Sequence, residues 1–218
     1  MRQINLFAKR LFDIFASFIG IILLIVFPVY LIVILAIRIT SKGPALFKQT
    51  RVGKDTRPFV MFKFRTMIVE QYDANGEEIM SEDRITKIGK ILRKTSLDET
   101  PQLFNILFGH MSFVGPRPML EYQAGRCTKT EKRRFIMRPG VTGLAQIKGR
   151  NNIVWTERIK YDVEYVEKFN VFYDFMIIVK TILLVFKKTG TDVKPEYRQV
   201  DRFSRDYIPE PSENIENE

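Results

Sequence analysis

The longest run of hydrophobic residues in the chain extends from Ile14 to Ile37. At 24 residues, it is long enough to cross a bilayer as one straight helix. Pro28, preceded by Phe27, lies near its middle, and a proline inside a helix removes a backbone hydrogen bond and bends the axis. The run therefore predicts a membrane helix with a bend at Phe27 and Pro28, within a membrane-inserted segment over residues 1–40.

Basic residues flank this hydrophobic run on both sides. They are Arg2, Lys9 and Arg10 before it and Arg38, Lys42 and Lys48 after it. Because Lys and Arg near a membrane helix favour the cytoplasmic side, this distribution favours a re-entrant helix that enters and leaves on one face. An ordinary kinked spanning helix is the alternative. The length of the run and the lack of a small-residue cleavage pattern exclude a signal peptide.

The pattern after this segment predicts a second domain over residues 41–190. Alternation of apolar and polar residues predicts two strands, Ala45–Gln49 and Phe59–Thr66, joined by a turn into a hairpin. In the second strand Phe62 and Phe64 point to one face, and Lys63 and Arg65 point to the other. Such a face is usually solvated, so the pattern alone assigns it no chemistry.

Helical periodicity predicts an amphipathic helix over Trp155–Phe169 and a more apolar one over residues 172–186. On the first helix Asp162 and Glu164 do not face each other, and we interpret them as surface charges. The second helix is too short to cross a bilayer comfortably, so it lies either at the membrane interface or in the core. The charged, apolar-poor composition of residues 191–218 predicts a disordered acidic tail.

Together these elements predict an α+β fold that is mainly helical. A re-entrant membrane helix would precede a cytoplasmic domain with a small β-hairpin and interfacial amphipathic helices. The net charge of the 218 residues is +10, so an anionic partner is expected: a membrane surface, a phosphorylated substrate or nucleic acid. Cys127 is the only cysteine, which excludes an internal disulfide; we interpret it as an inert residue in a reducing compartment.

Two adjacent carboxylates, Asp98 and Glu99, lie just before a predicted helix. With Thr100 as N-cap and Pro101 as the first helical residue, free amides and the helix dipole would favour ionised carboxylates and a bound phosphate. The alternative is a capping box from Ser96 to Glu99, which would leave Asp98 as an ordinary surface residue.

Arginines flank the two acids in the sequence. Arg93 precedes them, and Arg117 follows them between Pro116 and Pro118, whose rings make a rigid loop that aims the arginine. Arg138 lies in a glycine-rich loop, which is a weak signal by itself. Because two carboxylates can share a divalent cation and guanidinium groups bind phosphate oxygens in pairs, we predict a site for phosphate chemistry.

Several motifs occur in a characteristic order along the chain. They are Ser96-Leu97-Asp98-Glu99, Pro101-Gln102-Leu103 with Asn105, Met111-Ser112-Phe113-Val114-Gly115-Pro116-Arg117-Pro118, and Arg138-Pro139-Gly140-Val141-Thr142-Gly143. Together they resemble the bacterial sugar transferase family, the monotopic phosphoglycosyl transferases, from about Lys9 to about Lys188. Two residues depart from the family pattern: His110, where an acid is usual, and Phe27, where a serine commonly precedes the membrane proline.

The resemblance implies transfer of a phosphosugar from a UDP-sugar to polyprenyl (undecaprenyl) phosphate, with release of UMP. It implies that Asp98 is the nucleophile, forming a phosphosugar-aspartyl intermediate, that Glu99 assists it, and that both bind Mg²⁺. Phosphate or nucleotide contacts are expected from Lys63, Arg65, Arg93, Pro116, Arg117, Pro118 and Arg138. Membrane lipids are expected partners and nucleic acid is not; a homodimer is left open.

The implied location is the cytoplasmic face of the bacterial inner membrane, at the first membrane step of capsule, exopolysaccharide, O-antigen or glycoprotein glycan synthesis. One alternative is a membrane-bound glycosyltransferase that releases UDP, which would normally carry a D-x-D motif; the chain has none. Another is a non-catalytic membrane adaptor, which has no use for an acid pair between arginines. A nucleic-acid-binding protein would explain the charge but not the hydrophobic run.

Overall fold

The computed structural model describes residues 2–70, 72, 83–149, 153–186 and 202–203. Its helices and strands are α1 (Arg2–Val26), α2 (Val29–Thr40), β1 (Leu46–Val52), β2 (Pro58–Phe64), α3 (Lys87–Thr95), α4 (Gln102–Leu107), β3 (Ser112–Val114), α5 (Glu121–Gly125), β4 (Gly140–Thr142), α6 (Leu144–Gly149), α7 (Trp155–Lys168) and α8 (Val171–Phe186). Short 3-10 helices are η1 (Lys54–Thr56), η2 (Leu97–Glu99) and η3 (Glu131–Ile136). The described chain is thus mainly helical with a small β-hairpin, as the sequence predicts.

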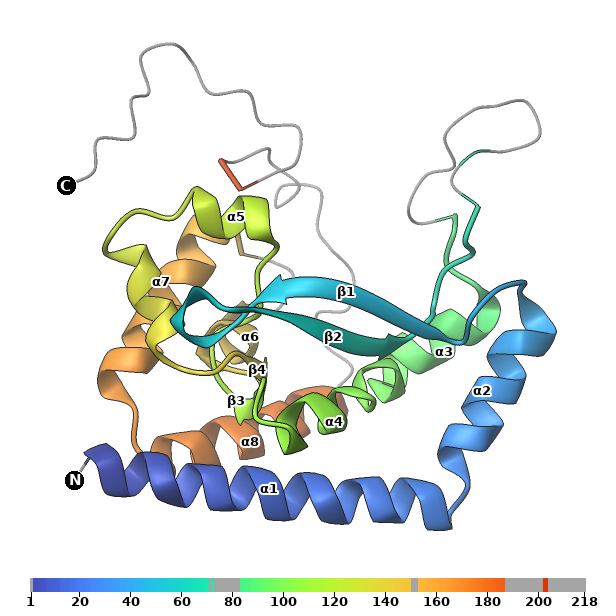
Figure 1. Ribbon diagram of the computed structural model, residues 1–218, viewed down its shortest axis with the longest axis horizontal. Helices are drawn as coiled ribbons and strands as arrows, with labels where there is room; N and C mark the ends of the chain where they lie inside the picture. The colour runs from blue at the N-terminus through green and yellow to red at the C-terminus, as the bar shows by residue number, and fades with distance from the viewer. Residues whose placement is uncertain (1, 71, 73–82, 150–152, 187–201, 204–218) are drawn as a thin grey trace.

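Helices α1 and α2 form an L along one side of the molecule (Figure 1). They meet at an angle of 63°, and the break falls at Phe27 and Pro28, where the sequence predicts a bend. The ring of Pro28 blocks a continuous helix because it has no N–H to donate. Among the described helices none is by itself both long and apolar enough for a membrane span, whereas α1 and α2 taken together meet those criteria of length and composition.

Helix α1 buries three polar side chains of its middle part against the protein. Its buried residues follow each other at intervals of four, on one face of the helix: Lys9, Asp13, Ser17 and Ile21. The other faces expose large apolar side chains, including Ile4, Phe7, Leu11, Phe15, Phe18 and Ile22. This is the reverse of a helix on a water-soluble surface, where the polar stripe faces outward.

The buried polar residues of α1 attach the helix to the rest of the fold. Lys9 Nζ lies 2.5 Å from Oδ2 of Asp174 in α8 and donates a 2.8 Å hydrogen bond to the carbonyl of Val114. The Asp13 carboxylate accepts hydrogen bonds from the hydroxyl of Ser112 and the backbone N–H of Phe113. Both side chains therefore anchor α1 to strand β3.

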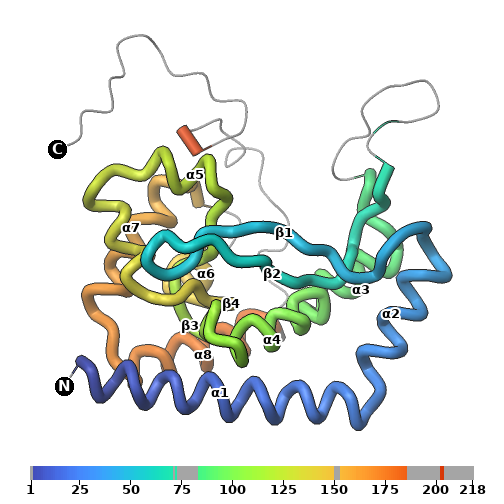
Figure 2. Tube along the Cα trace, in the orientation of Figure 1, coloured from blue at the N-terminus to red at the C-terminus, as the bar shows by residue number. Residues whose placement is uncertain are grey.

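The hairpin of β1 and β2 crosses the middle of the molecule (Figure 2). The strands are antiparallel in the register Leu46↔Phe64 to Val52↔Pro58, which confirms the predicted hairpin. Its buried side chains contact two layers: Phe64 packs with residues of α2 and α3, and Met61 packs with Ile106 of α4. The hairpin therefore connects helix α2 to the segment that carries the two acids.

Strands β3 and β4 are parallel and bring two distant motifs into contact. Glycines allow this approach: a Cβ on Gly115 would lie 2.3 Å from the carbonyl oxygen of Arg138, and one on Gly140 would lie 2.1 Å from the nitrogen of Gly115. The loop that carries Arg117 consequently lies beside the start of α6.

The interpretation of Asp162 as a surface charge is wrong. Asp162 is 1 % exposed, and its Oδ2 lies 2.5 Å from Nη2 of Arg134, which is equally buried. Helical position does not reveal this contact because Arg134 is 28 residues away in the sequence. Glu164 does lie near the surface, in a pair with Lys168.

Helix α8 is neither a wholly buried core helix nor a freely solvated one. Ile177 and Asp174 are buried on one face, while Phe172, Phe175, Ile182 and Leu183 are exposed on the other. The predicted tail over residues 191–218 lies outside the described residues except at 202–203, where Phe203 is fully buried against Val52 and Met119.

Candidate active site

The two acids lie in η2, a single turn between α3 and α4. Ser96 ends α3 in the left-handed conformation with φ of 57°, and the backbone N–H of Glu99 then donates to the carbonyl of Ser96. The side chain of Ser96 makes no capping hydrogen bond, so the capping-box alternative is wrong. Helix α4 begins at Gln102 after Pro101, one residue later than the sequence predicts. Asp98 and Glu99 thus precede the helix, as expected.

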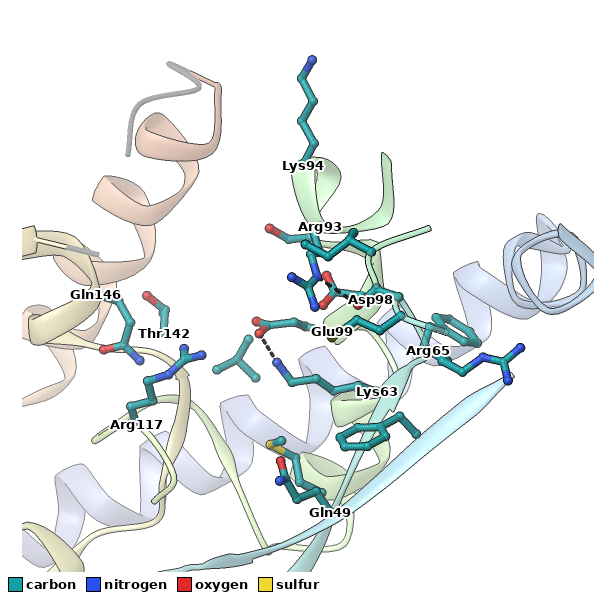
Figure 3. Close-up of a pocket in the computed structure, with 18 of the residues that line it drawn as sticks. Gln49, Lys63, Arg65, Arg93, Lys94, Asp98, Glu99, Arg117, Thr142 and Gln146 are labelled. Carbon is teal, nitrogen blue, oxygen red and sulfur yellow. Dashed lines mark hydrogen bonds and ion pairs between the residues drawn. The ribbon is translucent and has the colours of Figure 1, made fainter. Parts of the chain in front are cut away.

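A cavity of about 1600 Å³ opens beside this turn. Figure 3 shows Asp98 and Glu99 on one wall, with Arg117, Thr142 and Gln146 on the opposite side. The rest of its lining includes eight cationic side chains: Arg51, Lys63, Arg65, Arg84, Lys90, Arg93, Lys94 and Arg158. The excess of cations over acids suits a highly charged anionic ligand such as a diphosphate.

Glu99 is paired with a cation of the hairpin. Lys63 Nζ lies 2.5 Å from Oε1 of Glu99, and both side chains are largely buried. Burial alone would raise the pKa of Glu99, but the opposing charges of Lys63 and Arg117 outweigh it, and the pKa is lowered. Glu99 is therefore held as a carboxylate.

The pKa of Asp98 is shifted in the opposite direction, upward. Burial, and next the negative charge of Glu99, raise its pKa to about 6, although Lys63 and Arg93 act in the other direction. At neutral pH the group is still mainly ionised, but it is less well compensated than Glu99. A poorly compensated carboxylate facing a cavity is a candidate nucleophile.

Arg117 and Arg93 approach the acids from different elements. Arg93, on α3, donates from Nε to Oγ1 of Thr66 at 2.9 Å, which fixes the side chain near Asp98. Arg117 points into the cavity from the loop after β3 (Figure 3). Its backbone carbonyl accepts a 2.6 Å hydrogen bond from the buried Arg134. The loop is therefore held by tertiary contacts in addition to its two prolines.

Arg51 is a cavity residue that the sequence reasoning missed. Burial, and next the charge of Arg117, lower the pKa of Arg51 to about 10, so the two cations are close enough to repel each other. The residue extends from β1 on the same side as Gln49, whose Oε1 accepts a 2.6 Å hydrogen bond from it. The sequence carried a signal for Arg51. Phe47 pairs with Lys63 in the hairpin and lines the cavity, and alternation along β1 puts Arg51 on the same face as Phe47.

Two other predicted phosphate contacts bond to backbone carbonyls, although Arg65 also lines the cavity. The Arg65 guanidinium donates to the carbonyls of Ser41 and Lys42 at the end of α2, pointing away from the acids in Figure 3. Arg138 donates to the carbonyl of Gly109, close to Arg10 of α1, and is not among the residues that line the cavity.

The two prolines around Arg117 shape the loop and do not line the cavity. Pro116 lines a separate small space with Arg134. The carbonyl of Pro118 accepts a hydrogen bond from Arg51. Cys127 is buried, and burial raises the pKa of its thiol to about 11, which agrees with an inert residue.

The donor set at the acid pair fits one kind of metal site. Within the described part of the chain no three His, Cys, Asp or Glu side chains are grouped so as to hold a metal ion. Mg²⁺, however, is commonly held by one or two carboxylates together with substrate phosphates and water. Asp98 and Glu99, adjacent and facing a cation-lined cavity, fit that arrangement.

The chain belongs to the bacterial sugar transferase family, whose family model matches residues 4–188. This confirms the family and the enzyme class that the motifs predict. The most similar relatives include the uncharacterized sugar transferase EpsL of Bacillus subtilis (strain 168), 41% identical over 182 residues, which are 84% of this chain and 89% of the relative. The exopolysaccharide production protein PSS of Rhizobium leguminosarum bv. phaseoli is 42% identical over 192 residues, 82% of this chain and 95% of that protein.

A third relative carries a more specific name. The UDP-glucose:undecaprenyl-phosphate glucose-1-phosphate transferase of Klebsiella pneumoniae is 41% identical over 195 residues, 85% of this chain. Those residues are 42% of the Klebsiella protein, so this chain spans less than half of its length.

Proposed function

We propose that this protein transfers a sugar phosphate from a UDP-sugar to polyprenyl (undecaprenyl) phosphate and releases UMP. The observation that carries the proposal is the acid pair in the cavity: Asp98, with a pKa of about 6, beside Glu99, which is paired with Lys63. The name of the Klebsiella relative, a UDP-glucose:undecaprenyl-phosphate glucose-1-phosphate transferase, supports it.

In the first step, an Oδ atom of Asp98 attacks the phosphorus that bears the sugar. The bond from that phosphorus to the oxygen bridging the two phosphates breaks, and its electron pair leaves with UMP. The ionised carboxylate requires no general base. Arg117 and Lys63, whose charges both lower the pKa of Glu99, would oppose the charge of the diphosphate.

In the second step, a phosphate oxygen of the polyprenyl phosphate attacks the same phosphorus. The bond to Asp98 breaks, and the aspartate leaves as a carboxylate. The product is a polyprenyl diphosphate carrying the sugar. Glu99 stays ionised throughout because Lys63 holds its charge.

Mg²⁺ is the metal that suits this chemistry. Asp98 and Glu99 would hold it, and the ion would neutralise part of the charge on the diphosphate. Asp98 and Glu99 contribute their carboxylate oxygens, while Arg93 and Lys63 limit the negative charge of the pair.

The apolar outer faces of α1 and α8 support a location at the membrane. Lipid would cover the exposed side chains of both helices, and the bend at Phe27 and Pro28 would return the chain to the cytoplasmic face. The catalytic cavity would then face the cytoplasm, where nucleotide sugars are found. The reaction would begin the assembly of a lipid-linked glycan at this membrane.

The deciding experiment is product analysis with purified protein, Mg²⁺, undecaprenyl phosphate and a panel of UDP-sugars. Lipid-dependent UMP is expected, and UDP would instead identify a glycosyltransferase. With donor labelled in the sugar phosphate and no acceptor, label should remain covalently attached to the wild type and be absent from Asp98→Asn. Wild-type turnover without any trapped label would contradict the aspartyl intermediate.

A further inference from the structure

The wall of the cavity opposite the acids has a different chemical character. Helices α6 and α8 contribute the apolar side chains of Ala145, Ile147, Leu184 and Val185. The hydroxyls of Thr142 and Thr181, on the same wall, lie 2.7 Å apart and bond to each other. Because these side chains are uncharged, this part of the wall suits an uncharged part of the ligand.

Gln146 is the unusual residue on this wall. Its amide Oε1 and Nε2 are both buried, and neither has a hydrogen-bond partner within the described residues. A buried amide without partners lowers the stability of the folded protein, so its retention calls for an explanation. Figure 3 shows Gln146 beside Thr142 and Arg117, across the cavity from Asp98 and Glu99.

Gly143 accommodates the amide of Gln146 in its present position. The residue at 143 is glycine, and a Cβ there would lie 2.9 Å from Oε1 of Gln146. Because Gln146 itself lines the cavity, a change in its side-chain torsions directs the amide toward a ligand without movement of α6.

We propose that Gln146 recognises the uracil of the nucleotide sugar, an inference that rests on the proposed use of a UDP-sugar. Uracil presents a donor, N3–H, next to carbonyl acceptors. Oε1 of Gln146 accepts from N3–H, and Nε2 donates to the neighbouring carbonyl oxygen, which satisfies both orphaned atoms. The flat apolar faces of the base pack against the side chains of Ile147 and Leu184.

The sugar is a poorer match for this wall. A hexose carries hydroxyls around its ring and needs several polar partners, whereas the two threonine hydroxyls here already bond to each other. A phosphate is also a poorer match, because its oxygens would satisfy Nε2 of Gln146 and leave Oε1 unpaired.

The test compares UMP with N3-methyl-UMP, whose base lacks the N3–H donor, on the wild type and on Gln146→Met. For the wild type, we expect methylation to weaken UMP binding by roughly 10-fold, the order seen when a bidentate amide–base contact is lost. Gln146→Met should bind UMP about as weakly and show no further loss with the methylated ligand. The proposal would be overturned if N3-methylation weakened binding to Gln146→Met as much as binding to the wild type. It would also be overturned if Gln146→Met bound UMP as tightly as the wild type does.

The unfolding temperature of Gln146→Met distinguishes a ligand-binding role of the amide from a structural one. Gln146→Met removes an unsatisfied buried amide, so the unliganded variant should unfold at the same temperature as the wild type or higher. A clear decrease would mean that the amide supports the fold. Lys148→Met is the matched control, since Lys148 is exposed on the same helix and should leave both UMP affinity and unfolding unchanged.

A second comparison separates the base from the sugar. If Gln146 binds the sugar instead, Gln146→Met will change the ratio of kcat/KM for UDP-glucose and UDP-galactose while UMP affinity stays constant, and the uracil assignment is then wrong. UMP binding requires no transfer reaction. The two proposals can therefore fail separately. If only the proposed function is wrong, the wild type will bind UMP through Gln146 but will release no UMP from any UDP-sugar.

Discussion

Lys63 of β2 and Glu99 of η2 lie 2.5 Å apart, from Nζ to Oε1, inside the cavity. Their ion pair connects the hairpin to the turn that carries both acids, across 36 residues of sequence. The same cation lowers the pKa of Glu99 and opposes the rise in the pKa of Asp98. Lys63 therefore favours the ionised form of both acids.

Replacing Lys63 with methionine should shift the pH dependence of activity. Without the cation, the pKa of Asp98 rises further above its present value of about 6, so more of the carboxylate is protonated at neutral pH. The acidic limb of kcat/KM against pH should move to higher pH. The control is Lys54→Met, in the exposed turn of the hairpin, for which the acidic limb of the pH profile should not move. An acidic limb that also stays in place in Lys63→Met would argue against the coupling of Lys63 to Asp98.

Asp98→Asn should abolish turnover and stabilise the protein at neutral pH. The folded pKa of about 6 lies above the ordinary value of 3.8, so the folded state binds the proton more tightly and loses relative stability as pH rises from 3.8 through 6. Asparagine removes that loss.

Thermal unfolding of wild type and Asp98→Asn across pH checks this prediction. The midpoint of the variant should be higher at pH 7.5, and the difference should shrink toward pH 4. A variant that is less stable than the wild type at pH 7.5 would contradict the assigned direction of the pKa shift.

Arg134→Met should destabilise the fold by about 3–5 kcal/mol, because it leaves the buried Asp162 carboxylate without its cation. The double variant Arg134→Met/Asp162→Leu should lose less, since no charge is then left buried. Chemical denaturation measures both. Arg133→Met is the control: its pair with Glu167 is half exposed, so a change below about 1 kcal/mol is expected. Equal losses in the single and double variants would contradict this account.

If the proposed membrane location holds, the two ends of the α1–α2 pair should lie on the same side of the membrane. Gln3→Cys and Lys42→Cys place single thiols at exposed positions before and after the bend, and the native Cys127 is buried. A membrane-impermeant maleimide should label both positions in inverted vesicles and neither in intact right-side-out vesicles. Labelling of the two positions from opposite sides would identify an ordinary spanning helix.

The sequence by itself determined what depends on neighbours along the chain. The break at Pro28 follows from a missing N–H, the hairpin from period-2 alternation, and α7 from helical periodicity. The acid pair and the loop around Arg117 were also evident, because their residues are contiguous and their order matches the bacterial sugar transferase family.

Only the tertiary structure decided which charges meet. It buried Asp162 against Arg134, turned Arg65 toward the end of α2, and placed Arg138 outside the cavity lining. It also brought Arg51 of β1 and Gln146 of α6 to one cavity. The physical reason is that periodicity gives the face of an element but not the element packed against it, and the pKa of a charged group depends on that partner.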